Sequence, residues 1–177
     1  MEIDLSELEK APRAFGETFE VSAADLGDPV VAGALSVRLE GSVRRAGESF
    51  HVEGRVEVRG AVRCARCMAR VPWEAVERFD YELRPVSEAP VEEETELEDD
   101  ELEVAFLDEP VLDLGELAVQ QVLLALPMKP LCDERCAGLC AGCGADLAAG
   151  EPCTCGAAAV DPRWAPLLAL KNDPDRS

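Results

Sequence analysis

The sequence predicts an α+β fold: an antiparallel β-meander packed with one or two helices, plus a C-terminal cysteine-rich module that binds zinc. Three observations predict this fold. Apolar and polar residues alternate through three runs within residues 35–83, and the pattern of a capped helix follows at residues 113–126. Six of the eight cysteines lie within residues 131–156, a stretch poor in large apolar residues. We therefore expect a β-rich domain over residues 1–127 and a zinc module with a terminal helix over residues 128–177.

The alternating runs are typical of strands with one buried face and one solvent-exposed face. The inward sets of the three runs are Leu35, Val37, Leu39 and Val43, then Phe50, Val52, Val56, Val58 and Val62, then Val71, Trp73, Ala75, Phe79, Tyr81 and Leu83. Because the second run ends at Cys64 and the third begins after Cys67, this C-x-x-C turn is expected at the tip of a β-hairpin. A shorter strand is expected over residues 102–107.

Helix signals mark residues 113–126. Asp113 is the expected N-cap, Glu116 the returning member of a capping box, and Pro127 ends the helix. The second half of this helix is apolar on all sides, so it is expected to be buried between the sheet and the zinc module.

Two glutamines and a terminal helix complete this part of the prediction. Gln120 and Gln121 interrupt the apolar surface and are expected to contact solvent. A last short helix is expected to start at Asp161, with proline at its first position. Its packing residues are Trp164, Leu167, Leu168 and Leu170.

Charge is unevenly distributed along the chain, whose formal net charge is −20. Residues 35–70 contain eight arginines against four glutamates, whereas residues 88–109 contain twelve acidic side chains and no basic one. We expect a solvated acidic loop over about residues 86–101. The arginines fit either cross-strand pairing with glutamates or contact with phosphate.

The chain start suggests a cytoplasmic protein without a membrane partner. No basic region followed by an apolar one opens the chain, and no later segment approaches about 18 uncharged apolar residues. Because reducing compartments disfavour structural disulfides, paired cysteines at short spacings indicate a metal site.

The cysteine spacings predict two zinc ions, each held by four thiolates. Eight cysteines accompany a single histidine. We favour one site of Cys64, Cys67, Cys132 and Cys136 and a second, local site of Cys140, Cys143, Cys153 and Cys155. Local closure of a short loop costs less entropy, which favours this pairing. Two alternatives are that the two C-x-x-C turns share one ion, or that Cys136 and Cys140 exchange sites.

Other metal chemistry fits the sequence less well. The spacing from Cys136 to Cys143 matches a radical-SAM iron–sulfur motif, but that chemistry needs a larger barrel and leaves the other cysteines without a role. Four thiolates close the coordination shell, whereas a catalytic zinc keeps an open position, so structural zinc is expected. Iron in a four-thiolate site remains chemically reasonable.

The order of several short motifs resembles the YceD family, bacterial and plastid proteins linked to accumulation of the large-subunit (23S) ribosomal RNA. The motifs are "VRCARCMARV", an acidic stretch, "LDLGELAVQQVLLALPMKPLC", "CAGLCAGCGADL" and "CTCGAAAVDPRWAPLLALK". The resemblance spans about residues 35–171 and implies a role in synthesis, processing or stability of that RNA, without a known catalytic activity. It also implies that Cys64, Cys67, Cys132 and Cys136 form the common site, which some relatives keep alone. Family members usually carry acidic residues at the positions of Gln120 and Gln121.

Two functions of different class follow. The chain has no nucleophile with a base and an orienting group, so we expect no enzyme and no small-molecule substrate. The first hypothesis is an assembly factor that contacts ribosomal RNA or a pre-ribosomal particle through Arg59, Arg63, Arg66 and Arg70. The second is an acidic adaptor or chaperone in which Glu92, Glu93 and Glu94 help capture a basic ribosomal protein.

Overall fold

A computed structural model describes residues 1–8, 11–89, 104–153 and 155 of the chain. The chain divides into two compact units, described separately below. The first unit comprises residues 1–65 and 69–132, and the second comprises residues 66–68 and 133–177.

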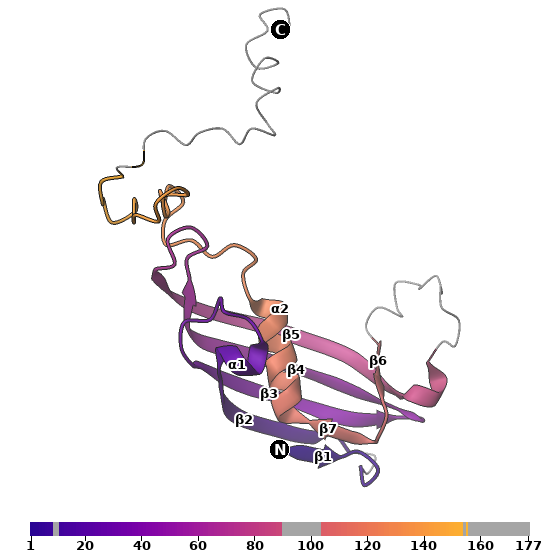
Figure 1. The fold of residues 1–177 in the computed structure, drawn as a ribbon. Helices are drawn as coiled ribbons and strands as arrows, with labels where there is room; N and C mark the ends of the chain where they lie inside the picture. The colour runs from indigo at the N-terminus through magenta and orange to yellow at the C-terminus, as the bar shows by residue number, and fades with distance from the viewer. Residues whose placement is uncertain (9–10, 90–103, 154, 156–177) are drawn as a thin grey trace, which may run out of the picture. The chain divides into compact units, whose positions relative to one another are not determined.

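The first unit is built on a five-stranded sheet in the order β2-β3-β4-β5-β6 (Figure 1). Its strands are β2 (Arg13–Val21), β3 (Leu35–Ala46), β4 (Ser49–Arg63), β5 (Arg70–Pro85) and β6 (Val104–Leu107). The three central strands form the expected antiparallel meander, with the first C-x-x-C turn between β4 and β5. The short strand β6 instead runs parallel to β5 and pairs only with its last four residues.

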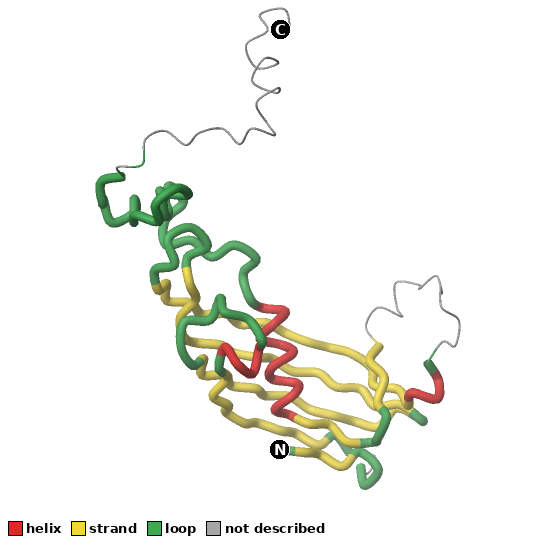
Figure 2. The backbone as a smooth tube through the Cα atoms, viewed as in Figure 1, coloured by secondary structure: helices red, strands yellow, loops and turns green. Residues whose placement is uncertain are grey.

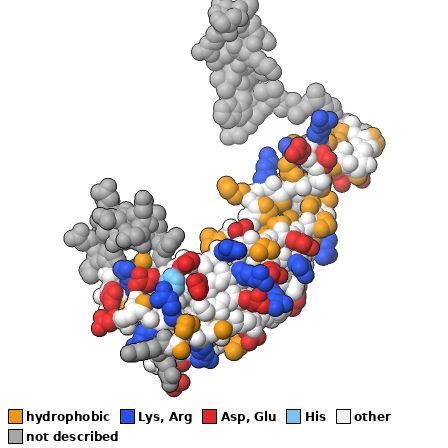
Figure 3. Space-filling model, turned by 180° about the vertical axis from the view of Figure 1, so that it is seen from behind, with side chains coloured by type: hydrophobic (Ala, Val, Ile, Leu, Met, Phe, Trp, Pro, Cys, Tyr) orange, Lys and Arg blue, Asp and Glu red, His pale blue; other side chains and the backbone are white. Residues whose placement is uncertain are grey.

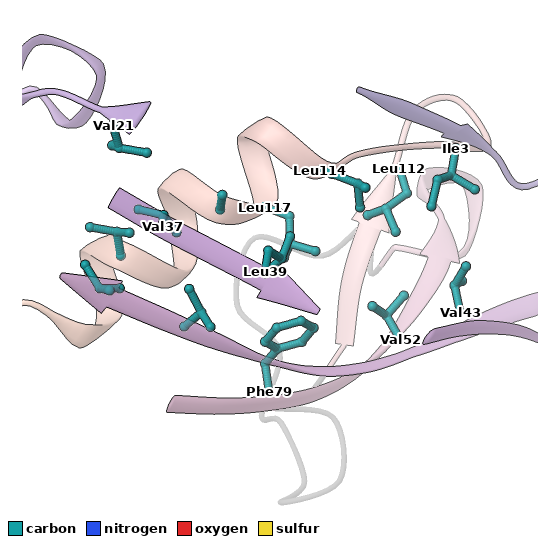
Figure 4. Packing of buried hydrophobic residues seen from close by; sticks show 14 of the residues in the cluster. Ile3, Val21, Val37, Leu39, Val43, Val52, Phe79, Leu112, Leu114 and Leu117 are labelled. Carbon is teal, nitrogen blue, oxygen red and sulfur yellow. The ribbon is translucent and has the colours of Figure 1, made fainter. Parts of the chain in front are cut away.

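Helix α2 (Leu114–Ala125) covers the apolar face of this sheet, where it contacts β2, β3, β4 and β5 (Figure 1). The inward residues of β3 and β4 expected from alternation are all buried. On β5, Phe79 and Leu83 are buried, whereas the other inward residues are half-buried. Figure 4 shows Val37, Leu39, Val52 and Leu117 among the packed side chains of this core.

Two facing glycines let neighbouring strands approach closely in the middle of the sheet. Gly41 of β3 pairs with Gly54 of β4. A Cβ on Gly41 would lie 2.7 Å from the Phe15 ring, and a Cβ on Gly54 would lie 2.5 Å from the Phe79 ring. The aromatic rings therefore occupy the space that side chains at these positions would fill.

The cap and the buried face of α2 differ in part from expectation. The Asp113 side chain caps the helix by accepting hydrogen bonds from the backbone N–H of Gly115 (2.6 Å) and Glu116 (3.0 Å). Within the described residues, Glu116 makes no return bond to complete a capping box.

The buried positions of α2 recur at helical spacing: Leu114, Leu117, Ala118, Gln121 and Val122. The expectation that the second half is buried throughout is therefore wrong, because Leu123 is 43% exposed and Leu124 is 79% exposed. Gln121, expected to contact solvent, is buried because it lies on the inward stripe, whereas Gln120 is exposed.

Several short elements, most of them in the first 34 residues, were not indicated by the sequence patterns. Strand β1 (Glu2–Asp4) pairs with β7 (Val111–Asp113) in a second, two-stranded sheet. Helix α1 (Ala23–Leu26) starts at Ser22 with a complete capping box to Asp25 and ends at Gly27, whose φ is 63°. A 3₁₀ turn, η1 (Val86–Glu88), follows β5.

The second unit consists of turns and loops over its described residues (Figure 2). A bridge pairs Leu139 with Asp146, and the N–H groups of Leu147 and Ala148 donate to the carbonyl of Gly138. The expected helix from Asp161 and the acidic positions 92–94 lie outside the described residues. None of the described helices is long and apolar enough to cross a membrane.

Candidate metal centres and charged sheet face

Eight cysteines gather in two groups of four, the grouping favoured from their spacing. One group is Cys64, Cys67, Cys132 and Cys136, and the other is Cys140, Cys143, Cys153 and Cys155. Within each group the four sulfur atoms lie within 4.8 Å of one another. Tetrahedral coordination with Zn–S bonds of about 2.3 Å separates the sulfurs by about 3.8 Å, so each group could hold a metal ion.

The hairpin turn between β4 and β5 presents the first two thiols. The Cys64 N–H donates to the carbonyl of Ala69 (2.8 Å), and the Ala65 N–H donates to the carbonyl of Pro130 (2.8 Å). Met68 turns the chain back with a left-handed φ of 63°. Three members of the first group, Cys64, Cys67 and Cys136, are buried.

Arg66 orders the backbone of the second unit. Its guanidinium donates to the carbonyls of Glu134 (3.1 Å) and Cys136 (2.9 Å). Its own carbonyl accepts from the N–H of Leu139 (3.0 Å). A Cβ on Gly138 would lie only 3.0 Å from that same carbonyl, and φ there is 74°, so glycine suits this position. Sequence reasoning missed this role, because only the fold brings residue 66 beside residues 134–139.

The second group is more exposed than the first. Its sulfur–sulfur distances include 3.0 Å for Cys153–Cys155, 3.2 Å for Cys140–Cys153 and 3.7 Å for Cys143–Cys153. Three of its four thiols are exposed, and Cys140 is half-buried. A Cβ on Gly142 would lie 3.0 Å from the Cys155 sulfur, so the x-Gly-Cys part of the turn leaves room for that thiol.

Hydrogen bonds and crowding move two thiol pKa values in opposite directions. Donation from the backbone N–H of Cys143, supported by Cys153 and by the N–H of Gly142, lowers the pKa of Cys140 to about 6. The neighbouring thiols, Cys153 first, raise the pKa of Cys155 to about 12. Four thiolates this close repel one another unless a cation lies among them, which is the chemistry of a four-thiolate metal site.

The polar face of the sheet is a mixed-charge surface rather than a uniformly basic one (Figure 3). Glu40 forms ion pairs with both Arg38 and Arg55, and Arg55 also lies 3.0 Å from Glu57. Hydrogen bonds from Arg38 and then Arg55 lower the pKa of Glu40 below its usual value. Ion pairs with glutamates on this face thus account for both arginines: Arg38 pairs with Glu40 along β3, and Arg55 pairs with Glu40 across the strands.

A different situation holds for Arg59, Arg63 and Arg70 near the C-x-x-C turn. Arg63 stands directly opposite Arg70 in the β4–β5 register, and Arg59 stands opposite Glu74. All three arginines are exposed, and none forms an ion pair with the described residues. Like charges placed directly opposite each other on a sheet are unfavourable, so an anion would be accommodated here. We call these residues the hairpin arginines.

The first unit also carries a groove of about 1040 Å³. Gly41, Gly54, Tyr81 and Gln120 are among the residues that line it. Burial raises the pKa of Tyr81 to about 12, so its phenol stays protonated at neutral pH.

The single histidine lies on the polar face of the same unit. The imidazole Nε2 of His51 lies 3.1 Å from the carboxylate of Asp80, and Glu53 is the third member of this cluster. No described serine or cysteine is hydrogen bonded to His51, so this pair lacks the nucleophile of a catalytic triad.

Comparison with known proteins gives one family and several relatives. A family model described as "Large ribosomal RNA subunit accumulation protein YceD" matches residues 51–171. Uncharacterized proteins of Mycobacterium bovis and of two strains of Mycobacterium tuberculosis are each 32% identical over 179 residues, covering 96% of this chain and 81% of the relative. No solved structure shows significant similarity to the chain.

Proposed function

Because this chain belongs to the YceD family of large ribosomal RNA subunit accumulation proteins, we propose that it is a non-enzymatic, zinc-stabilised factor that supports synthesis, processing or stability of 23S ribosomal RNA. Membership of this family is the observation that supports the link to large-subunit ribosomal RNA. The zinc, the direct contact with RNA and the absence of catalysis are our own proposals.

The two cysteine groups support structural zinc. Each offers four sulfurs at distances that suit a tetrahedral ion, and a closed thiolate shell leaves no position for substrate. The second unit is built of turns over its described residues and has few buried apolar side chains. Metal binding in small modules contributes on the order of 10–16 kcal/mol of apparent free energy, enough to replace a hydrophobic core. Bound zinc would act as a cross-link between chain segments.

The hairpin arginines support direct contact with RNA phosphate. Arg63 and Arg70 form a like-charge pair at the end of the hairpin, and Arg59 lies on the same polar face. Phosphate contacts of this kind supply affinity and salt dependence without sequence specificity. Arg66, the fourth arginine expected to contact RNA, also donates to two backbone carbonyls, so its removal would confound a binding test.

Charge-matched variants test this contact. We expect Arg63→Ala/Arg70→Ala to weaken binding to a 23S RNA fragment, measured by filter binding over a salt series. The slope of log K against log salt should fall by about 1.4 to 1.8 for the loss of two phosphate contacts. The matched control is Arg38→Ala/Arg55→Ala, which removes the same charge from arginines already paired with glutamates. Equal loss of binding in both variants would contradict a local contact and leave only a net-charge effect.

The acidic segment favours a second candidate function. Twelve acidic and no basic side chains within residues 88–109, in a chain of net charge −20, suit an adaptor that captures a basic ribosomal protein. Replacing Glu92, Glu93 and Glu94 by glutamine should then weaken binding to that protein and leave RNA binding unchanged. The hairpin arginine variant should do the reverse, so the two variants separate the two functions.

A further inference from the structure

Strand β5 has a long edge without a partner strand in the described parts of the chain. β5 runs from Arg70 to Pro85, but β6 pairs only with residues 82–85. Along residues 71–81 the neighbour on one side is β4, and no described strand occupies the other side (Figure 1). An open edge of this length exposes backbone N–H and C=O groups that can pair with another strand.

The polar face of this edge is self-complementary. Val76 lies at the midpoint of residues 71–81, with Glu74 two positions before it and Arg78 two positions after it. If an identical strand pairs antiparallel with Val76 opposite itself, Glu74 stands opposite Arg78 of the partner subunit, and Arg78 opposite Glu74 of the partner subunit. A one-residue shift of this register would destroy both charge pairs.

Pairing with a second copy would give Arg78 an oppositely charged neighbour. In the β4–β5 register it stands directly opposite Arg55, an unfavourable like-charge pair. Arg55 is already held by Glu40 and Glu57, whereas Arg78 forms no ion pair with the described residues. Val76 is 64% exposed on the same face, an apolar residue at the centre of the open edge.

We propose that two copies of this chain associate by antiparallel pairing of their β5 edges over residues 71–81, with Val76 on the twofold axis. The interface is isologous, because the same edge serves both subunits, and it closes after two copies. Strand β6 ends the matched region at residue 82 of each copy. Pro72, which has no N–H to donate, stands near one end of the paired region, opposite Asp80 of the partner subunit. It therefore removes a backbone hydrogen bond at the end of the interface and not at its centre.

A charge swap tests the register. By sedimentation velocity over about two decades of protein concentration, wild type should sediment as a dimer that dissociates on dilution. Glu74→Arg and Arg78→Glu should each raise the dimer dissociation constant at least about tenfold, because each change turns two attractions into two repulsions. The double variant Glu74→Arg/Arg78→Glu should recover the dimer, since its pattern is complementary again. Circular dichroism melting establishes that each variant is folded.

A cysteine at the axis tests the same geometry independently. Only residue 76 faces its own copy, so Val76→Cys should give a covalent dimer on mild oxidation beyond that of wild type treated alike. Thr18→Cys, an exposed position on the opposite edge strand β2, is the matched control and should not. A monomer at every concentration would overturn the proposal. A dimer that ignores both charge reversals and does not cross-link at residue 76 would overturn it as well.

Discussion

Gly54→Ala is expected to destabilise the first unit strongly although it adds a single methyl group. The added Cβ would lie 2.4 Å from the carbonyl oxygen of Glu40 and 2.5 Å from the Phe79 ring. It would also lie 3.0 Å from the Cα of Gly41 on the facing strand. Two of these three obstacles are backbone atoms of β3, which cannot rotate away, so the strands must separate where Gly41 and Gly54 pair. Overpacking of this kind costs about 1–3 kcal/mol, and rigid obstacles place Gly54→Ala near 3 kcal/mol.

Gly16→Ala is the matched control for this prediction. Gly16 is also a strand glycine, but its nearest neighbour, a side-chain carbon of Glu40, would lie 3.8 Å from the new Cβ. This is an ordinary contact, so the free energy of unfolding should change by no more than about 0.5 kcal/mol. The assay is urea unfolding of zinc-saturated protein followed by circular dichroism. Equal stability of the two variants would refute the view that close strand approach requires Gly54.

Three further predictions concern the metal centres and the helix cap. Cys64→Ser/Cys67→Ser should lower the zinc content from two ions to one, measured by elemental mass spectrometry on protein purified without added metal; iron with sulfide would contradict structural zinc. Cys140→Ser/Cys143→Ser should also lose one ion, but should leave the urea midpoint of the β-sheet unchanged, because this group lies in the second unit. Asp113→Ala should cost about 1 kcal/mol of unfolding free energy at neutral pH, since it removes the N-cap of α2. Hydrogen bonds from the N–H of Glu116 and then Gly115 lower the pKa of Asp113. The stabilisation by this carboxylate is therefore present above the usual carboxyl pKa and is lost as the pH falls through the lowered value. The effect of Asp113→Ala on the unfolding free energy should shrink in acid, and an effect that does not change with pH would contradict the cap.

Local patterns predicted the centre of the fold well. Strict alternation over residues 35–63 indicated which side chains of β3 and β4 are buried, because a strand with one wet face repeats every two residues. Asp113 and Pro127 marked α2 because capping and chain breaking depend on adjacent residues. Helical periodicity was less informative where apolar residues are consecutive. Because residues 122–126 are all apolar, the sequence did not show which side of α2 faces inward, and it therefore did not predict that Gln121 is buried and Leu124 exposed.

The short N-terminal elements and the parallel pairing of β6 escaped prediction for a related reason. β1 has three residues, too few for alternation to be recognised, and the strand expected over residues 102–107 carries no local signal for the direction of its pairing. Their positions depend on partners distant in the sequence, such as β7 for β1. Strand β2 was not predicted either, because its sequence pattern is weak and its position depends on pairing with β3.

The sequence by itself determined the strand faces, the hairpin at Cys64 and the capped helix, because each depends on neighbours within about one turn or one strand. Cysteine spacing favoured two groups of four but left other pairings open, and the fold brings Cys64 and Cys67 to Cys132 and Cys136. Only the tertiary structure decided which arginines are neutralised. Arg55 meets Glu40 of the neighbouring strand, whereas Arg63 meets Arg70, and this difference comes from cross-strand register. The tertiary structure also decided that β6 pairs with only the last four residues of β5, which leaves the rest of that edge without a partner strand among the described residues. A one-dimensional pattern specifies which face a side chain occupies, but its opposite neighbour is chosen only when strands pair.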